Sequence, residues 1–361
     1  MRPKENEIID KLSNQKDWCQ PLVPGQIVRK FALTDNYEID AVIEFSIPEG
    51  PSFRAAVELL TISTPKAISL KCNVLKSSLS EFRKSKLVPM IIAPYINKKQ
   101  SKVLSDEGIS WIDLSGNMLL NIPPDIYIER TGKPNKFPDT APIKKVYQGT
   151  SSLVSRALLL NPQGFSSLSE IADFINNQNG KITLATVSKV LKSLEEELLI
   201  TRKKSGIFVK QPEQLLDNLA EGYADYSKTK KDCIYKYDVD NIDQLCKAFY
   251  DADVDYAYCD FYAAKIKGLG VTEQVSIFIR SMQDLEKTLK TTPGIASDDE
   301  EFGQVTFIET KNPCVWFNSQ GEKSQKVIDN LELYLEMIND RPRGPKIARQ
   351  LKDRIIGKFN G

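Results

Sequence analysis

The first third of the chain alternates between short apolar runs and amphipathic stretches. Apolar or alternating runs predict strands over residues 26–33, 39–46, 53–62, 87–93, 108–114 and 118–122. Residues 5–18 are a polar helix candidate, helical spacing of apolar side chains predicts a helix over residues 73–86, and another helix is expected over residues 98–107. Because strands that alternate with helices indicate a sheet covered by helices, residues 1–136 are expected to form an α/β domain.

The rest of the chain changes pattern twice. Residues 129–149 carry several prolines and little periodicity, which is typical of a linker. Helical patterns dominate residues 150–226, and from Lys236 strands and helices alternate again, ending in helices over 325–339 and 344–356. The sequence therefore predicts an α/β multidomain chain with a central module over 150–211 and a C-terminal α/β domain over 212–361.

The central module has the pattern of a winged helix-turn-helix. A first helix is predicted over 152–160, and a second begins at Ser167, where Glu170 completes a capping-box pattern. A third helix is predicted over 184–198 after a cap at Thr183. A basic hairpin with its tip at residues 204–206 follows.

The third helix is expected to have one packed face and one outward face. Its apolar stripe consists of Leu184, Val187, Leu191, Leu194 and Leu198. At about 100° per residue the opposite face carries Ala185, Thr186, Lys189, Lys192 and Ser193. Small, hydroxylated and basic side chains suit a major groove, so we predict that this face binds double-stranded DNA.

The hairpin adds the basic residues Arg202, Lys203 and Lys204, which are expected to reach the adjacent DNA backbone or minor groove. The alternative interpretation of the central module is a small helical interaction domain whose lysines are merely solvated.

Composition narrows the classes of function. The chain of 361 residues has net charge +1, but its charges are unevenly placed. Residues 63–102 contain many lysines and arginines with Glu81 as their single acid, and residues 341–358 are likewise basic with Asp353 as their single acid. The run Asp298–Glu301 is acidic. These basic stretches favour a polyanion as partner, although charge runs are usually only solvated faces.

The absence of histidine excludes imidazole-based catalysis and histidine-containing zinc sites. The six cysteines are scattered singly, which favours free buried thiols. No apolar run has the length of a membrane span and the N-terminus lacks a signal-peptide pattern, so we expect a cytoplasmic protein with no membrane partner.

Two acids in the N-terminal domain resemble the metal site of restriction-endonuclease-like folds. Asp40 and Glu58 lie in neighbouring predicted strands, but the position two residues after Glu58 is Leu60 instead of the lysine that would orient water. Lys66 or Lys71 could replace it, although no sequence feature requires this. We therefore expect a degenerate endonuclease-like fold without catalytic residues, metal or cofactor.

A second polar motif in this domain, Asp113-Leu-Ser-Gly-Asn117, is interpreted as a tight turn that Asp113 stabilises, in preference to a site.

Several of these segments resemble one family. The chain is similar to antitoxin-like transcriptional regulators of type IV (abortive-infection, AbiEi-like) toxin–antitoxin systems. The similarity lies in the segments 88–96 and 108–117, in a winged helix that ends with the segment 186–200, and in the segments 260–265 and 342–352. The resemblance implies a DNA-binding repressor of its own operon, paired with a nucleotidyltransferase-like toxin.

The leading hypothesis is thus a DNA-binding transcriptional regulator and not an enzyme. A DNA-processing nuclease targeted by the winged helix is the alternative, and a protein-interaction scaffold is a third class. The basic segment Arg341–Lys358 is expected to add DNA affinity without sequence preference, or else to be a solvated terminal helix. The operator, any effector and the oligomeric state stay open.

Overall fold

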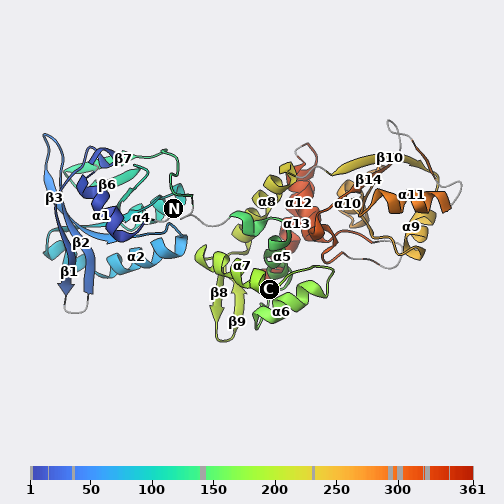
Figure 1. The fold of residues 1–361 in the computed structure, drawn as a ribbon, viewed down its shortest axis with the longest axis horizontal. Helices are drawn as coiled ribbons and strands as arrows, with labels where there is room; N and C mark the ends of the chain where they lie inside the picture. The colour runs from blue at the N-terminus through green and yellow to red at the C-terminus, as the bar shows by residue number, and fades with distance from the viewer. Residues whose placement is uncertain are drawn as a thin grey trace. The chain divides into compact units, whose positions relative to one another are not determined.

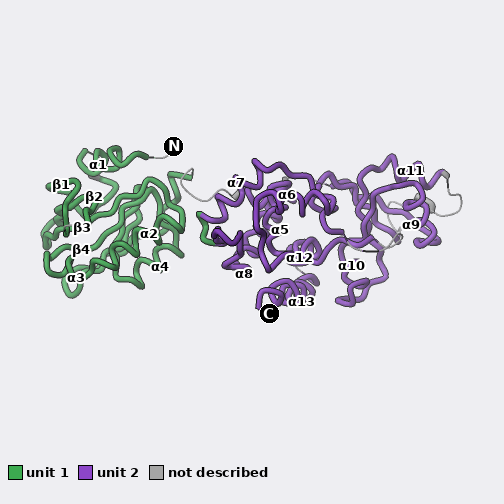
Figure 2. Tube along the Cα trace, turned by 90° about the horizontal axis from the view of Figure 1, so that it is seen from below, with its two compact units in different colours: residues 1–143, 196–198 green, residues 144–195, 199–361 purple. Residues whose placement is uncertain are grey.

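The computed structural model describes residues 3–14, 16–34, 37–138, 144–229, 232–291, 296–298, 304–319, 321, 326–340 and 342–360. The chain forms two compact units, which Figure 2 distinguishes by colour: residues 1–143 with 196–198 are unit 1, and residues 144–195 with 199–361 are unit 2. Both units contain sheets and helices, so the predicted α/β multidomain class is confirmed. Within the described ranges, the helices are all too short or too polar to cross a membrane.

Unit 1 is built on a mixed sheet whose seven strands lie side by side in chain order. Figure 1 shows this sheet with the helices that cover it. The strands are β1 (Val23–Thr34), β2 (Tyr37–Ser46), β3 (Ser52–Leu59), β4 (Leu87–Ala93), β5 (Ser110–Asp113), β6 (Met118–Ile122) and β7 (Ile126–Arg130). The pairs β3–β4 and β4–β5 are parallel, and the other neighbouring pairs are antiparallel. The six predicted strands are confirmed, and β7 is an addition to them.

Helices cover both faces of this sheet. Ile8 and Leu12 of α1 (Glu5–Asn14) join a core on one face. On the other face, Ile68, Phe82 and Leu104 join a second core from α2 (Pro65–Ser77), α3 (Leu79–Lys84) and α4 (Lys98–Asp106). Both crossovers between parallel strands thus run on the same side, as a uniform crossover hand requires when the strands lie in chain order.

The helix predicted over residues 73–86 differs from the structure. Two helices occupy this stretch, because α2 begins eight residues earlier, with Pro65 in its first turn and the Thr64 hydroxyl accepting a hydrogen bond from the amide of Ala67 (3.3 Å). Proline and threonine favour those two positions. The helix ends at Ser77 and is capped by Ser78, whose amide donates to the carbonyl of Leu75, and α3 begins at Leu79.

Unit 2 begins with three helices and a hairpin (the helix–hairpin region, residues 150–211). Its elements are α5 (Ser152–Leu160), α6 (Leu168–Asn176), α7 (Leu184–Glu196), β8 (Ile200–Lys203) and β9 (Gly206–Val209). These bounds confirm the predicted helix over 152–160 and the predicted hairpin.

The long helix α8 (Pro212–Thr229) leads to a second sheet, with strand order β11-β12-β14-β10-β13. The strands are β10 (Cys233–Val239), β11 (Tyr256–Tyr258), β12 (Val275–Ile279), β13 (Ala296–Asp298) and β14 (Val305–Glu309). The helices are α9 (Ile242–Asp251), α10 (Asp260–Ile266), α11 (Met282–Thr291), α12 (Asn330–Asn339) and α13 (Gly344–Ile356).

One hydrophobic core runs through unit 2 across the predicted domain boundary at 211/212. Leu153 of α5, Leu191 of α7, Leu216 of α8 and Leu335 of α12 all belong to it. The helix–hairpin region and the C-terminal sheet therefore form one compact unit where the sequence suggested two.

The linker was predicted over residues 129–149, but residues at both ends of this range belong to the folded units. Val146 and Tyr147 are buried in the unit 2 core, while residues 139–143 lie outside the described ranges. All six cysteines are free, as predicted, but Cys233 is exposed instead of buried.

Candidate nucleic-acid interface

Local hydrogen bonds fix the starts of α6 and α7. The Ser167 hydroxyl accepts a hydrogen bond from the amide of Glu170 (3.1 Å), and the Glu170 carboxylate accepts one from the amide of Ser166 (2.6 Å). The expected capping box is thus present with its return bond moved by one residue. The Thr183 hydroxyl accepts a hydrogen bond from the amide of Thr186 (3.3 Å), so Thr183 caps α7 as predicted.

The packed face of α7 differs from the predicted stripe at both ends. Val187, Leu191 and Leu194 are buried as expected, together with Val190. Leu184, however, is 53% exposed because it lies in the first turn of the helix, outside the core. The helix ends at Glu196, and Leu198 has a left-handed backbone (φ 59°), so the predicted helical position of Leu198 is wrong.

The outward face of α7 carries most of the predicted DNA-binding residues. Ala185, Lys189 and Lys192 are exposed, and Thr186 is half-buried. Ser193 is only 9% exposed, so its predicted place on the outward face is wrong. At 100° per residue it lies at the flank of the helix between the two faces, beside the buried stripe.

Two exposed residues were missed in the sequence and lie in the same region. Ser188 is exposed on α7 next to Lys189, and Lys181 is exposed in the turn that precedes the helix. Lys181 carries no helical pattern, but its position three residues before α7 is a sequence signal that could have included it. Both residues offer hydroxyl or ammonium groups to a polyanion.

The hairpin is held against the helices by two glycines. Phe165 and Ile207 exchange backbone hydrogen bonds of 3.1 and 2.7 Å, which add a third short strand segment to the hairpin. A Cβ atom on Gly206 (φ 140°) would lie 2.6 Å from the carbonyl oxygen of Phe165, and one on Gly164 (φ 80°) would lie 2.5 Å from that of Ile207. Only glycine permits this close approach of two backbones.

The three basic residues of the hairpin are not equivalent. The guanidinium of Arg202 pairs with the carboxylate of Glu195 (3.1 Å), so its charge is already partly neutralised. Lys203 and Lys204 are exposed at the tip. Among the described residues, Lys203 and Lys204, like Lys189 and Lys192 of α7, have no carboxylate partner. Their ammonium groups can therefore contact phosphates without first breaking an ion pair.

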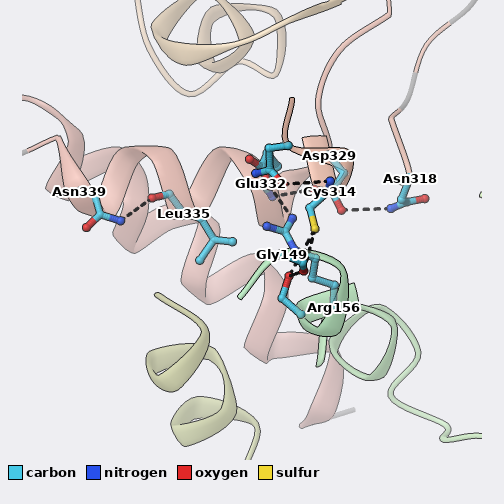
Figure 3. A network of polar contacts seen from close by, with 10 residues as sticks. Gly149, Arg156, Cys314, Asn318, Asp329, Glu332, Leu335 and Asn339 are labelled. Atoms are coloured by element: carbon cyan, nitrogen blue, oxygen red, sulfur yellow. Dashed lines mark hydrogen bonds and ion pairs between the residues drawn. The ribbon is translucent and has the colours of Figure 1, made fainter. Parts of the chain in front are cut away.

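A buried ion pair connects the helix–hairpin region to the C-terminal part of unit 2 (Figure 3). Arg156 of α5 donates to Glu332 of α12 over 2.5 Å, and the two side chains are 2% and 0% exposed. Burial alone would lower the pKa of Arg156, but the charge of Glu332 raises it. The guanidinium of Arg156 therefore stays charged in the core, where the strength of its contact with Glu332 depends on geometry.

A separate cluster of Asp40, Glu58, Lys71 and Tyr37 (the carboxylate–lysine cluster) lies in unit 1. The ammonium of Lys71, on α2, is 3.1 Å from a carboxylate oxygen of Asp40 on β2 and also binds Glu58 on β3. The Tyr37 hydroxyl donates to Glu58 (2.6 Å), and the amide of Leu59 donates to Asp40 (2.9 Å). The two acids of the predicted endonuclease-like motif thus meet a lysine that comes from a helix.

The protonation states of this cluster follow from burial and hydrogen bonding. Burial raises the pKa of Glu58, and its hydrogen bond with Asp40 raises it further. Burial also acts upward on Asp40, but hydrogen bonds from Glu58, the Leu59 amide and Lys71 lower its pKa overall. Burial would lower the pKa of Lys71, yet both acids raise it, so its ammonium lies between the two carboxyl groups as a fixed cation.

No group of three or more His, Cys, Asp or Glu side chains suited to a metal ion occurs in the described ranges. In the carboxylate–lysine cluster, the ammonium of Lys71 contacts the carboxyl groups of both Asp40 and Glu58.

The segment Asp113–Asn117 has the structural role favoured from its sequence. The buried carboxylate of Asp113 accepts hydrogen bonds from the Ile96 amide (3.1 Å) and from the backbone and side chain of Asn117 (2.9 and 2.8 Å). Gly116 has φ 99°, as a tight turn requires. The Asp113 carboxylate therefore joins the turn to the loop between β4 and α4.

Helix α13 carries the C-terminal basic residues on its solvent side. Ile347, Leu351 and Ile355 are buried as predicted, while Arg349 and Arg354 are exposed. Lys352 donates to Asp217 of α8 (3.0 Å). Arg341 and residues 299–301 of the acidic run lie outside the described ranges.

Comparison with known proteins yields no relative: no family model, curated protein or solved structure matches the chain.

Proposed function

We propose that the chain is a DNA-binding transcriptional regulator that reads double-stranded DNA with a winged helix-turn-helix in residues 150–211. The observation that supports this most is the exposed row Ala185, Lys189 and Lys192 on α7, next to a hairpin with Lys203 and Lys204 at its tip. A helix whose exposed face carries small and basic side chains can enter a major groove, and an adjacent basic hairpin can reach the neighbouring DNA backbone.

The proposal extends to the biological setting. The resemblance to antitoxin-like regulators supports repression of the chain's own operon and partnership with a nucleotidyltransferase-like toxin, in the cytoplasm. Because unit 2 buries the helix–hairpin region and the C-terminal sheet in one core, we expect both parts to be needed for binding.

The direct test is to select duplexes from a random-sequence library with the purified full chain and to measure their affinity as salt is varied. We expect enrichment of one sequence and a logarithmic affinity that falls linearly with the logarithm of salt concentration. A chain that retains no duplex even at low salt would instead be a protein-interaction scaffold.

One observation favours a second function, that of a metal-dependent nuclease. The lysine absent from position 60 is supplied by Lys71, so Asp40, Glu58 and Lys71 form the acid–acid–lysine set that such enzymes use. The same contacts also argue for inactivity, because the ammonium already neutralises the carboxyl pair.

We therefore predict no measurable cleavage of plasmid DNA by the chain with magnesium or manganese. Supercoiled plasmid should stay intact over hours, as judged by gel electrophoresis. Cleavage that is lost in both Asp40→Ala and Glu58→Gln, but kept in Glu44→Gln at an exposed position of the same strand, would establish the nuclease instead.

The basic side of α13 is predicted to add affinity without sequence preference. Replacing Arg349, Lys352 and Arg354 by glutamine should weaken binding to a selected duplex and to a shuffled duplex equally, because cations along a helix attract phosphates but do not read bases. Arg349 and Arg354 are exposed, whereas Lys352 is half-buried and paired with Asp217. The measurement is fluorescence anisotropy with both duplexes. A loss confined to the selected duplex would refute the supporting role, and no loss on either would leave α13 as a solvated helix.

A further inference from the structure

The turn between α6 and α7 (residues 177–183, the inter-helix turn) is held by a segment from much later in the chain. The amide of Asn318 donates a hydrogen bond of 3.1 Å to the carbonyl of Gln178 in this turn. The neighbouring Phe317 is fully buried, and its ring meets that of Phe174 on α6 edge-on, with centroids 6.4 Å apart. The position of the turn is therefore set partly from outside the helix–hairpin region.

This later segment, Pro313–Asn318 (the brace), is itself anchored in the core of unit 2. The thiol of Cys314 donates to the carbonyl of Gly149 just before α5 (3.1 Å), as Figure 3 shows. The side-chain amide of Asn318 donates to Asp329 (3.3 Å), which is 1% exposed. Asp329 in turn accepts the amide of Glu332 (2.6 Å) and so caps α12. The brace thus connects the inter-helix turn to α5 and α12.

The residue at the end of the brace is suited to its backbone. Asn318 has φ 55°, the left-handed region that asparagine tolerates and that costs other side chains about 1 kcal/mol. This conformation lets the backbone amide of Asn318 bind the turn while its side chain binds Asp329. An alanine at this position would lose the Asp329 bond and would disfavour the conformation that presents the amide.

We infer that Asn318 is a positioning residue for sequence recognition, which fixes the inter-helix turn and with it the outward face of α7. This inference rests on the proposed DNA-binding function. Contacts to base edges require groups held within about 0.5 Å, whereas contacts to phosphates tolerate movement. Loss of the Asn318 contacts should therefore reduce sequence preference more than general affinity.

The test compares Asn318→Ala with Asn318→Gly and Asn339→Ala in the full chain. Glycine keeps the left-handed backbone without the side-chain bond. Asn339 is the matched control, because its side chain makes one hydrogen bond to Leu335 within α12 (2.8 Å) and does not contact the inter-helix turn. Two measurements are made on each variant: hydrogen exchange of peptides covering residues 177–183, and binding to a duplex selected by the wild-type chain and to a shuffled duplex of equal length.

For Asn318→Ala we expect faster exchange in the inter-helix turn and about tenfold weaker binding to the selected duplex, equivalent to ~1.4 kcal/mol, with shuffled-duplex binding unchanged. Asn318→Gly should fall between this variant and the wild type, and Asn339→Ala should match the wild type. Unchanged exchange in the turn, or equal weakening on both duplexes, overturns the inference. If the wild-type chain binds no duplex at low salt, the proposed function fails, and the exchange measurement alone still decides whether Asn318 positions the turn.

Discussion

Replacing both Lys189 and Lys192 by alanine is expected to weaken DNA binding by one to two orders of magnitude at moderate salt, about 1–3 kcal/mol. Both side chains lie on the exposed side of α7, opposite the buried residues Val187 and Leu191. If each ammonium contacts one phosphate, the slope of logarithmic affinity against logarithmic salt concentration should fall by about one unit for each substitution. Fluorescence anisotropy across a salt series measures both quantities.

The matched control removes the same charge elsewhere on unit 2. Lys247 of α9 and Lys290 of α11 are exposed lysines on helices of the C-terminal sheet, so Lys247→Ala with Lys290→Ala lowers the net charge by the same amount. This double variant should keep nearly all of the affinity and the salt slope. If the two double variants lose affinity equally, only the overall charge matters, and α7 is not the surface that binds.

Local sequence signals predicted the elements of the candidate interface well. The break Asn161-Pro162 follows the end of α5 where the sequence indicates, and Pro345 is the second residue of α13, because proline is excluded from helix interiors but tolerated in the first turn. Burial at the edges of a helix was predicted less well. Ser193 lies at the flank of α7, between its buried and exposed faces, where helical periodicity does not determine whether a side chain is buried. Its burial then depends on the elements that pack beside the helix.

Contacts between residues distant in sequence were beyond reach of these signals. The sequence left Lys66 and Lys71 as alternatives, because it does not show which lysine faces the strands; in the structure Lys71 of α2 binds Glu58. Arg156 and Glu332 are 176 positions apart, and each looks like an ordinary surface residue within its own helix. The tertiary packing that joins such pairs also explains why the helix–hairpin region shares a core with the C-terminal sheet.

Replacing Arg156 by methionine is expected to destabilise unit 2 by about 3–5 kcal/mol. The substitution keeps most of the side-chain volume but leaves the carboxylate of Glu332 buried, 0% exposed, without its cation. Neighbouring Asp329 would add to the penalty, since burial already raises its pKa. Hydrogen exchange of peptides from α5 and α12, measured in increasing urea, reports this loss for unit 2 without interference from unit 1.

Two further variants separate the lost ion pair from a simple packing defect. Arg280→Met breaks a pair of the same 2.5 Å length with Asp255, but both partners are about half exposed, so the expected cost is about 1 kcal/mol or less. Arg156→Met combined with Glu332→Leu removes both buried charges and should recover most of the stability, because apolar groups can replace a buried pair at little cost. If the double variant is as unstable as Arg156→Met alone, the loss comes from packing around α5 and α12 and not from the unpaired charge.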